Sequence, residues 1–163
     1  MKKTLVAIAA LTLVGAASAQ SSVTLYGRID ASIGSEKTTT GGVTTTDIGT
    51  QIRSGAHTGS RWGMKGTEDL GGGLKANFVL EQGFSIDNGA AVDGTKQFSR
   101  QAFVGLSGGF GSFTVGRQYD LIDVAYAAHD AFGSSGFSPN GALALGTGGD
   151  TIVRQDNSVL YST

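Results

Sequence analysis

The chain has 163 residues, of which 27 are glycine and one is proline, and it contains no cysteine. So many glycines with so little proline suit numerous short connections between strands, and they exclude collagen and proline-rich linkers. The lack of cysteine excludes disulfides and cysteine-ligated metal sites, and the formal net charge of −1 gives no basic excess that would indicate nucleic-acid binding.

The first 19 residues have the three parts of a secretory signal peptide. Lys2 and Lys3 provide the positive start, residues 5–14 form a short apolar segment, and residues 17–19 (Ala-Ser-Ala) provide the small side chains that a signal peptidase recognises. A transmembrane anchor would need roughly 20 apolar residues, which this stretch lacks. The exported chain would begin at Gln20, and because ten basic residues would then face thirteen acidic ones, its formal charge would be −3.

The first strand is expected at residues 22–34, where apolar and polar residues alternate throughout. A period of two predicts one apolar and one wet face, and the segment is long enough for the roughly 9–11 tilted residues that cross a bilayer. Residues 35–56 are rich in threonine and glycine without apolar periodicity, which predicts a long surface loop. No other apolar run could form a spanning helix, so any passage through a membrane is expected to use strands.

A hairpin is predicted next, with strands at residues 57–69 and 73–84. The glycines at its centre supply the backbone angles that a tight reversal needs. A polar loop at residues 85–97 leads to a second hairpin, with strands from Phe98 to Ser107 and onward to Tyr119 around a short glycine-rich break.

The connections between these strands are therefore alternately long and short. This asymmetry is typical of bacterial outer-membrane barrels, whereas a soluble sandwich gives no reason for it. Residues 120–150 form the longest connection, with one or two helical turns near residues 124–132, and residues 152–163 resume a strand. About six strands are too few for the smallest closed membrane barrels, which have about eight, so the chain is expected to be the N-terminal part of a larger barrel.

Three stretches resemble the general porins of Gram-negative outer membranes, particularly those of beta-proteobacteria. They are SVTLYGRID at residues 22–30, the hairpin at residues 60–82 with KGTEDLGGGLK at its centre, and SRQAFVGLSGGFG at residues 99–111 running on to GRQY. The resemblance implies an all-β fold, a transmembrane antiparallel β-barrel of about sixteen strands. It also implies a homotrimer in outer-membrane lipid, with the third outer loop folded into the lumen. Residues 20–163 would be the N-terminal part of this barrel, and residues 120–150 would be the constricting loop.

The chemistry of a pore lies in charged side chains that line a constriction. Alternation places Arg28 and Arg61 opposite apolar neighbours, and Arg100 opposite Phe103, so these three are expected to face water. The resemblance adds the basic cluster of the barrel wall, which would be Arg28, Arg61, Arg100 and Arg154. It also implies that acids of the loop face this cluster, and these would be Asp123 and Asp130. The alternative for any one arginine is that it merely occupies the wet side of a strand, where any polar residue serves.

Arg117 is expected to behave differently. It shares a face with Phe113 and Val115, so alternation sends it outward, to a rim or between subunits. Trp62 and Phe78 would face lipid or pack within a sheet.

These features predict a passive outer-membrane channel for ions and small hydrophilic solutes, with a preference for anions and without cofactors. The alternative is a secreted β-sandwich that acts as an adhesin or binding module. A secreted serine hydrolase is a third class, because residues 105–109 fit G-x-S-x-G; that motif, however, requires a strand leading into a helix, and here a turn leads to another strand. His57 and His129 lie far apart in expected loops, so no metal site is predicted.

Overall fold

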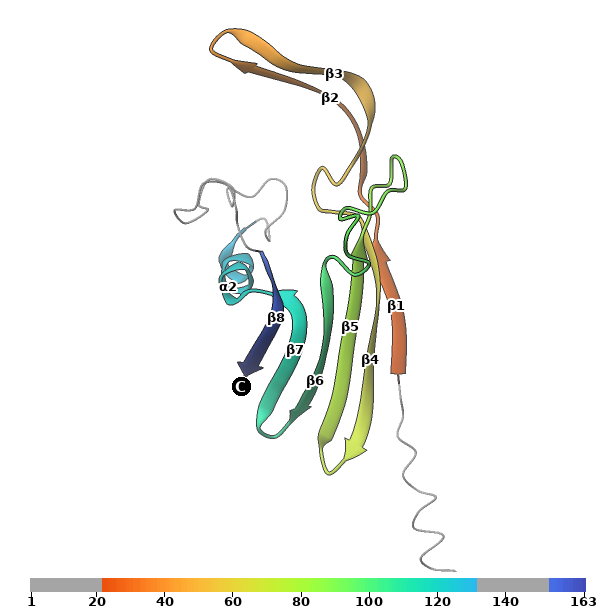
Figure 1. Ribbon diagram of the computed structural model, residues 1–163, viewed down its shortest axis with the longest axis vertical. Coiled ribbons are helices and arrows are strands. Elements are labelled where there is room, and N and C mark those ends of the chain that lie inside the picture. The colour runs from red at the N-terminus through yellow and green to blue at the C-terminus, as the bar shows by residue number, and fades with distance from the viewer. Residues whose placement is uncertain (1–21, 132–152) are drawn as a thin grey trace, which may run out of the picture.

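The computed structural model describes residues 22–131 and 153–163, so the expected signal peptide at residues 1–19 lies outside the described residues. Six of the described strands form one antiparallel sheet in the order β1-β4-β5-β6-β7-β8 (Figure 1). These strands are β1 (Ser22–Arg28), β4 (Arg61–Gly71), β5 (Leu74–Gly83), β6 (Gln101–Gly108), β7 (Gly111–Tyr119) and β8 (Arg154–Ser162). The six strands expected from the sequence are confirmed, with boundaries shifted by a few residues.

One face of this sheet is apolar along its whole width. Residues paired across antiparallel strands share a face, and the register runs from Val23 through Gly66, Phe78, Val104 and Val115 to Val159. A parallel row of this face joins Leu25, Met64 and Leu80. The alternation predicted for β1 and β5 is therefore confirmed.

Nothing in the described part of the chain covers this face. No hydrophobic residue of the described ranges is buried, and Leu25 and Val104 are 72% and 57% exposed. A β-sandwich would lay a second sheet over such a surface and bury it. A soluble protein rarely leaves so large an apolar face in water, so this surface must meet lipid or another apolar surface.

The first expected strand, residues 22–34, is interrupted. β1 ends at Arg28, and after Ile29 and Asp30 the chain enters β2 (Ala31–Thr40), which belongs to a separate two-stranded sheet with β3 (Val43–Ser54). The prediction of one continuous strand is wrong at this point because alternation continues across the break and gives no sign of it.

The loop predicted at residues 35–56 is also wrong, since most of it forms the β2–β3 hairpin that extends beyond the main sheet (Figure 1). Gly41 and Gly42 make its two-residue turn with φ angles of 61° and 80°, which suit the twist of a hairpin. Its threonines favour extended backbone. Apolar periodicity missed the hairpin because it buries no face: even Ile33 and Ile52 are 78% and 60% exposed.

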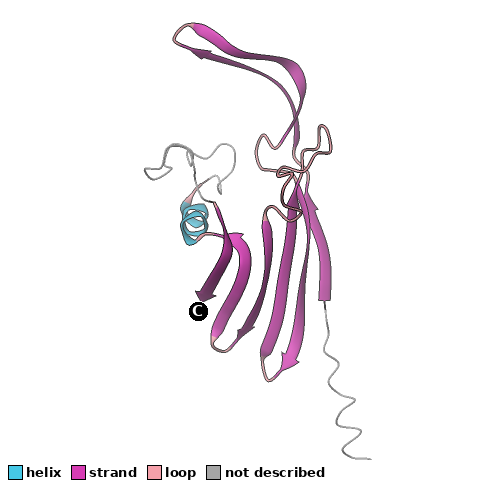
Figure 2. Cartoon of the chain, viewed as in Figure 1, coloured by secondary structure: helices cyan, strands magenta, loops and turns pink. Residues whose placement is uncertain are grey.

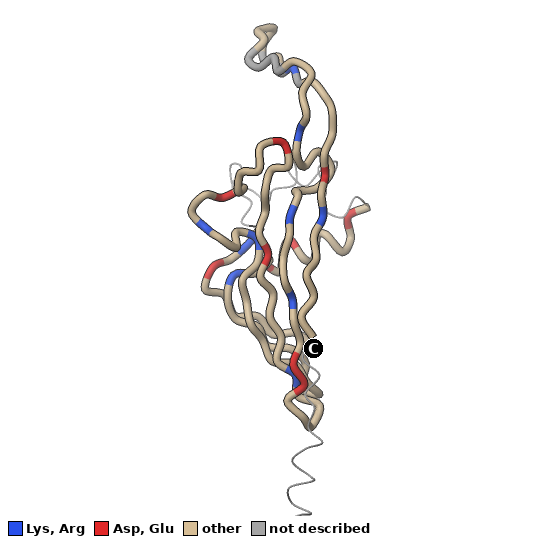
Figure 3. The backbone as a smooth tube through the Cα atoms, turned by 90° about the vertical axis from the view of Figure 1, so that its right-hand side faces the viewer, with Lys and Arg blue, Asp and Glu red and all other residues tan. Residues whose placement is uncertain are grey.

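The two ends of the main sheet differ, as the sequence predicts. Short turns join β4 to β5 and β6 to β7 at one end, whereas the other end carries the long connections (Figure 2). Charged residues gather at this long-loop end, with a smaller group at the β4–β5 turn (Figure 3).

The expected short helix is present as α2 (Leu121–His129), beside the long-loop ends of β7 and β8 (Figure 1). Its N-cap is Asp120, whose carboxylate accepts a hydrogen bond from the Asp123 N–H at 2.6 Å, a standard way to satisfy the free N–H groups of a helix start. Only residues 120–131 of the expected third loop are described. Within the described ranges, no helix is both long and apolar enough to span a bilayer.

Candidate pore-lining site

The second face of the main sheet carries polar and small side chains. In register, Tyr26 lies beside Gly63, Gly63 beside Glu81, and Glu81 beside Gln101. One step toward the long-loop end, Arg28 pairs directly with Arg61. The wet face expected from alternation is therefore confirmed for these two arginines.

A hollow of about 870 Å³ lies between this polar face and α2. Its lining includes five of the six residues predicted as pore residues, which are Arg28, Arg61, Arg100, Arg154 and Asp123. The sixth, Asp130, is not among the lining residues; it ends α2, where its backbone N–H donates to the Tyr126 carbonyl at 2.9 Å. Residues more than a hundred positions apart in the sequence thus meet in one place.

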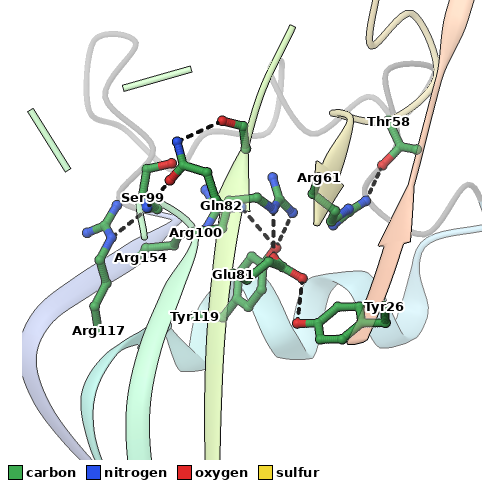
Figure 4. A network of polar contacts seen from close by, with 11 residues as sticks. Tyr26, Thr58, Arg61, Glu81, Gln82, Ser99, Arg100, Arg117, Tyr119 and Arg154 are labelled. Carbon is green, nitrogen blue, oxygen red and sulfur yellow. Dashed lines mark hydrogen bonds and ion pairs between the residues drawn. The ribbon is translucent and has the colours of Figure 1, made fainter. Parts of the chain in front are cut away.

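Glu81 is the central acid of the hollow, and its side chain is almost fully buried (Figure 4). Arg100 Nε donates to one carboxylate oxygen at 2.7 Å, and the Tyr26 hydroxyl donates to the other at 3.0 Å. A buried carboxylate without such partners would be strongly destabilising. With them, Glu81 neutralises one arginine and fixes its orientation.

Tyr119 joins Arg154 to Arg100 (Figure 4). Its hydroxyl accepts hydrogen bonds from Arg100 at 2.6 Å and from Arg154 at 2.9 Å. The guanidinium carbon of Arg154 also lies 4.5 Å from the centre of the Tyr119 ring, within the range of a cation–π contact. The tyrosine therefore holds two cations close together without cancelling the charge of either.

The hollow has a net positive charge. Four arginines line it, with Glu81 and Asp123 as lining acids; four positive and two negative charges leave a formal +2. Burial raises the pKa of Asp123 above its ordinary value, and the negative charge of the neighbouring Asp120 raises it further. Asp123 therefore loses its negative charge earlier than an ordinary aspartate as the pH falls. Guanidinium groups keep their charge at every physiological pH, so the hollow stays electropositive.

Arg100 reaches the hollow for a reason other than the predicted one. Alternation assumed that Phe103 points away from the lumen, yet Phe103 pairs with Val79 on the same face as Glu81. Arg100 precedes β6, so the pleat of that strand does not dictate its direction, and the ion pair with Glu81 turns its side chain toward the polar face. Arg100 therefore lines the hollow, although Phe103 does not lie on the face that alternation gave it.

Sequence reasoning missed three contributors, which are Glu81, Tyr26 and Gly63. Tyr26 reaches Glu81 across the whole width of β4, because Gly63 leaves the intervening position empty: a Cβ there would lie 2.6 Å from the Leu80 carbonyl oxygen and 3.0 Å from the Tyr26 hydroxyl. Glu81 lies on the wet face of a predicted strand, but only the pairing of strands shows that it meets an arginine.

Arg117 lies on the other face, in register with Ala102, as expected. Its guanidinium donates to the Ser99 carbonyl at 2.7 Å and to Asp156 at 2.6 Å, and Lys96 contacts the same carboxylate at 3.1 Å. Arg117 therefore fastens β8 to the loop before β6 and takes no part in the hollow.

A second hollow, of about 520 Å³, opens on the apolar face and is lined mainly by side chains such as Val23, Phe78, Leu106 and Phe113. Such a surface gives a hydrated ion no compensation for lost water, so this hollow is no route for solutes. The described residues also include no group of three histidine, aspartate or glutamate side chains that could hold a metal ion.

A sheet with an uncovered apolar face and a charged, hollowed polar face defines a class, the wall of a membrane pore. The chain belongs to the Gram-negative porin family, which matches it over residues 4–163. This membership decides against the β-sandwich adhesin.

Individual proteins agree with this assignment. The chain is 40% identical to an outer membrane porin protein of Bordetella pertussis over 174 residues, which cover 100% of this chain and 45% of that protein. It is 41% identical to outer membrane porin protein 32 of Delftia acidovorans over 168 residues, which cover 100% of this chain and 46% of that protein. The solved structure of an anion-selective porin from Comamonas acidovorans matches with a TM-score of 0.63 and 32% identity, over 87% of this chain and 42% of that one. The chain thus spans less than half the length of each.

Proposed function

We propose that this chain forms part of the wall of a water-filled outer-membrane channel, through which ions and small hydrophilic solutes diffuse passively and anions pass preferentially. The observation that carries the proposal is the convergence of four arginines on one hollow in the polar face of the sheet. At physiological salt the Debye length is about 8 Å, so charges around a constriction of similar width act on every passing ion. The solved porin from Comamonas acidovorans is named as anion-selective, which supports the proposed preference for anions.

The proposal includes further strands. β1 and β8 each have one neighbour in the described sheet, and an open edge is not tolerated in the hydrocarbon region of a bilayer. About sixteen strands would close a water-filled barrel, and three such barrels would form the homotrimer. Residues 120–150 would be the loop that narrows the lumen, bringing Asp123 and Asp130 opposite the arginines of the wall.

No reaction is needed for this function. A diffusion pore works through the charges and width of its lining, so we propose that the protein is not an enzyme and uses no cofactor. Ser107 supports this view: it lies in β6 just before a turn that leads into another strand, β7, whereas the hydrolase motif needs a following helix.

Ion selectivity of the protein purified from outer membranes tests the proposal. Reversal potentials in planar bilayers under a salt gradient should indicate anion preference, and changing Arg61 and Arg100 together to Gln should reduce it. Arg117→Gln is the control for Arg61→Gln and Arg100→Gln measured singly, because it removes one positive charge from the opposite face. A preference that survives the double change, or that falls as much in the control as in the single changes, would contradict the assignment of the pore lining.

A further inference from the structure

Asp30 lies between β1 and β2, outside both sheets, and it connects three segments of the chain at the edge of the hollow. Its carboxylate oxygen Oδ2 accepts hydrogen bonds from the backbone N–H groups of His57 at 2.9 Å and Thr58 at 2.7 Å. Its own backbone carbonyl accepts from the Gly55 N–H at 3.0 Å. One residue therefore fixes the irregular segment that leads from β3 into β4.

Ser60 closes this arrangement from the other side. Its side chain is 1% exposed, and its hydroxyl oxygen accepts from the Asp30 N–H at 3.0 Å and donates to the Asp30 carbonyl at 3.2 Å. The N–H donors, with Thr58 foremost, hold the pKa of Asp30 below its ordinary value. The carboxylate therefore remains ionised well below neutral pH, and its hold on the segment persists.

This segment is in direct contact with a pore arginine. Arg61 Nη2 donates to the Thr58 hydroxyl at 2.6 Å (Figure 4). Arg61 needs such a partner, because Arg28 stands directly opposite it in register, and like charges at that position repel. An arginine side chain also has many rotamers, so without a fixed acceptor it would swing away from its neighbour.

We propose that Asp30 and Thr58 are positioning residues for Arg61, which set the place of its guanidinium in the hollow and thereby the strength of anion selectivity. The inference rests on the proposed channel function. Asp30 acts indirectly: it fixes the Thr58 backbone, and the Thr58 hydroxyl then holds Arg61. Thr58 carries no charge, so its effect on the ion must pass through Arg61.

A double-mutant cycle separates this role from a general stabilising one. Thr58→Val keeps the size of the side chain but removes the acceptor, and Thr58→Ser keeps the acceptor. Each is made in the wild-type protein, in Arg61→Gln and in Arg28→Gln, and the anion-to-cation permeability ratio is measured from reversal potentials. Asp30→Ala is measured in the same three backgrounds. Because it removes the same negative charge from each background, a fold-change in the ratio that is lower in the wild type than in Arg61→Gln reports the part of its effect that passes through Arg61, and equal fold-changes in the two would overturn the role of Asp30. Thr58→Val carries the test if Asp30→Ala fails to assemble.

We expect Thr58→Val to lower the permeability ratio by about 1.4- to 1.6-fold, the change expected when a unit charge withdraws from about 10 to about 15 Å in water, with and without screening by salt. Thr58→Ser should restore the ratio. In the Arg61→Gln background Thr58→Val should have no further effect. In the Arg28→Gln background its effect should be smaller than in the wild type, because the repulsion from Arg28 is gone, but it should not vanish, because Arg61 still lacks its acceptor.

Two results would overturn the inference alone: an unchanged ratio in Thr58→Val, or an equal effect of that change with and without Arg61. A protein in which Arg61→Gln itself leaves the ratio unchanged would overturn the proposed pore lining as well, so the two failures are distinguishable.

Discussion

Glu81→Gln tests the electrostatics of the hollow most directly. The change removes one negative charge but keeps the shape of the side chain, and the glutamine oxygen can still accept from Arg100, its partner at 2.7 Å. Because four arginines, Glu81 and Asp123 line the hollow, the formal charge rises from +2 to +3. We therefore expect the anion preference to increase while the channel remains assembled.

The size of the effect follows from Coulomb's law. A unit charge about 10 Å from the path of an ion in water changes the energy of that ion by about 0.4 kcal/mol, with opposite signs for anions and cations. The difference of about 0.8 kcal/mol corresponds to about a fourfold change in the permeability ratio. At about 0.1 M salt the Debye length is about 10 Å, and screening reduces the change to roughly twofold.

The assay is the reversal potential of the purified channel under a salt gradient, repeated at low and high salt. Asp69→Asn provides the control, because it removes a carboxylate at the β4–β5 turn, whose oxygen accepts from the nearby Gly71 N–H. A ratio that does not rise in Glu81→Gln, or a rise that does not shrink with added salt, would refute the electrostatic reasoning.

Three further predictions test other parts of the structure. Burial raises the pKa of Asp123, so this side chain should lose its charge at a higher pH than an ordinary aspartate. Acidification should therefore increase the anion preference measured by reversal potential. Asp123→Asn should abolish this part of the pH dependence. Gly63→Ala places a methyl group 2.6 Å from a backbone oxygen. We therefore expect the free energy of unfolding, measured by heat or denaturant, to fall by about 1–3 kcal/mol. Gly49→Ala is the control and should be nearly neutral, because a Cβ at Gly49 would have nothing within 4 Å. Val104→Arg on the apolar face should reduce insertion into lipid vesicles at a cost of about 2–4 kcal/mol, and Thr114→Arg on the polar face should not; equal insertion of both would show that the faces are assigned incorrectly.

The arginines of the hollow illustrate how a channel can concentrate charge without losing it. Arg100 and Arg154 share the neutral hydroxyl of Tyr119, and Arg61 is held by the neutral hydroxyl of Thr58. Only Arg100 among these three has a described carboxylate partner. Hydroxyl acceptors fix a guanidinium by hydrogen bonding but leave its charge available to a passing anion, whereas a carboxylate would cancel it.

The strands and their faces could be predicted from the sequence wherever one face is apolar. Residues such as Leu25 and Phe78 repeat with a period of two, which is a local property of the chain and needs no knowledge of its partners. The alternately long and short connections are equally local. The β2–β3 hairpin could not be predicted in this way because it has no apolar face, so the signal on which the prediction depends is absent.

The candidate site divides along the same line. That Arg28 and Arg61 face water follows from their own neighbours in sequence. The tertiary structure alone decided three contacts: Arg100 binds Glu81, Tyr26 reaches Glu81 across Gly63, and Asp30 binds the segment before β4. The physical reason is that a side chain's direction depends on its own strand, whereas its partners depend on the register between strands, and a hydrogen bond forms only between groups that this register brings within about 3 Å.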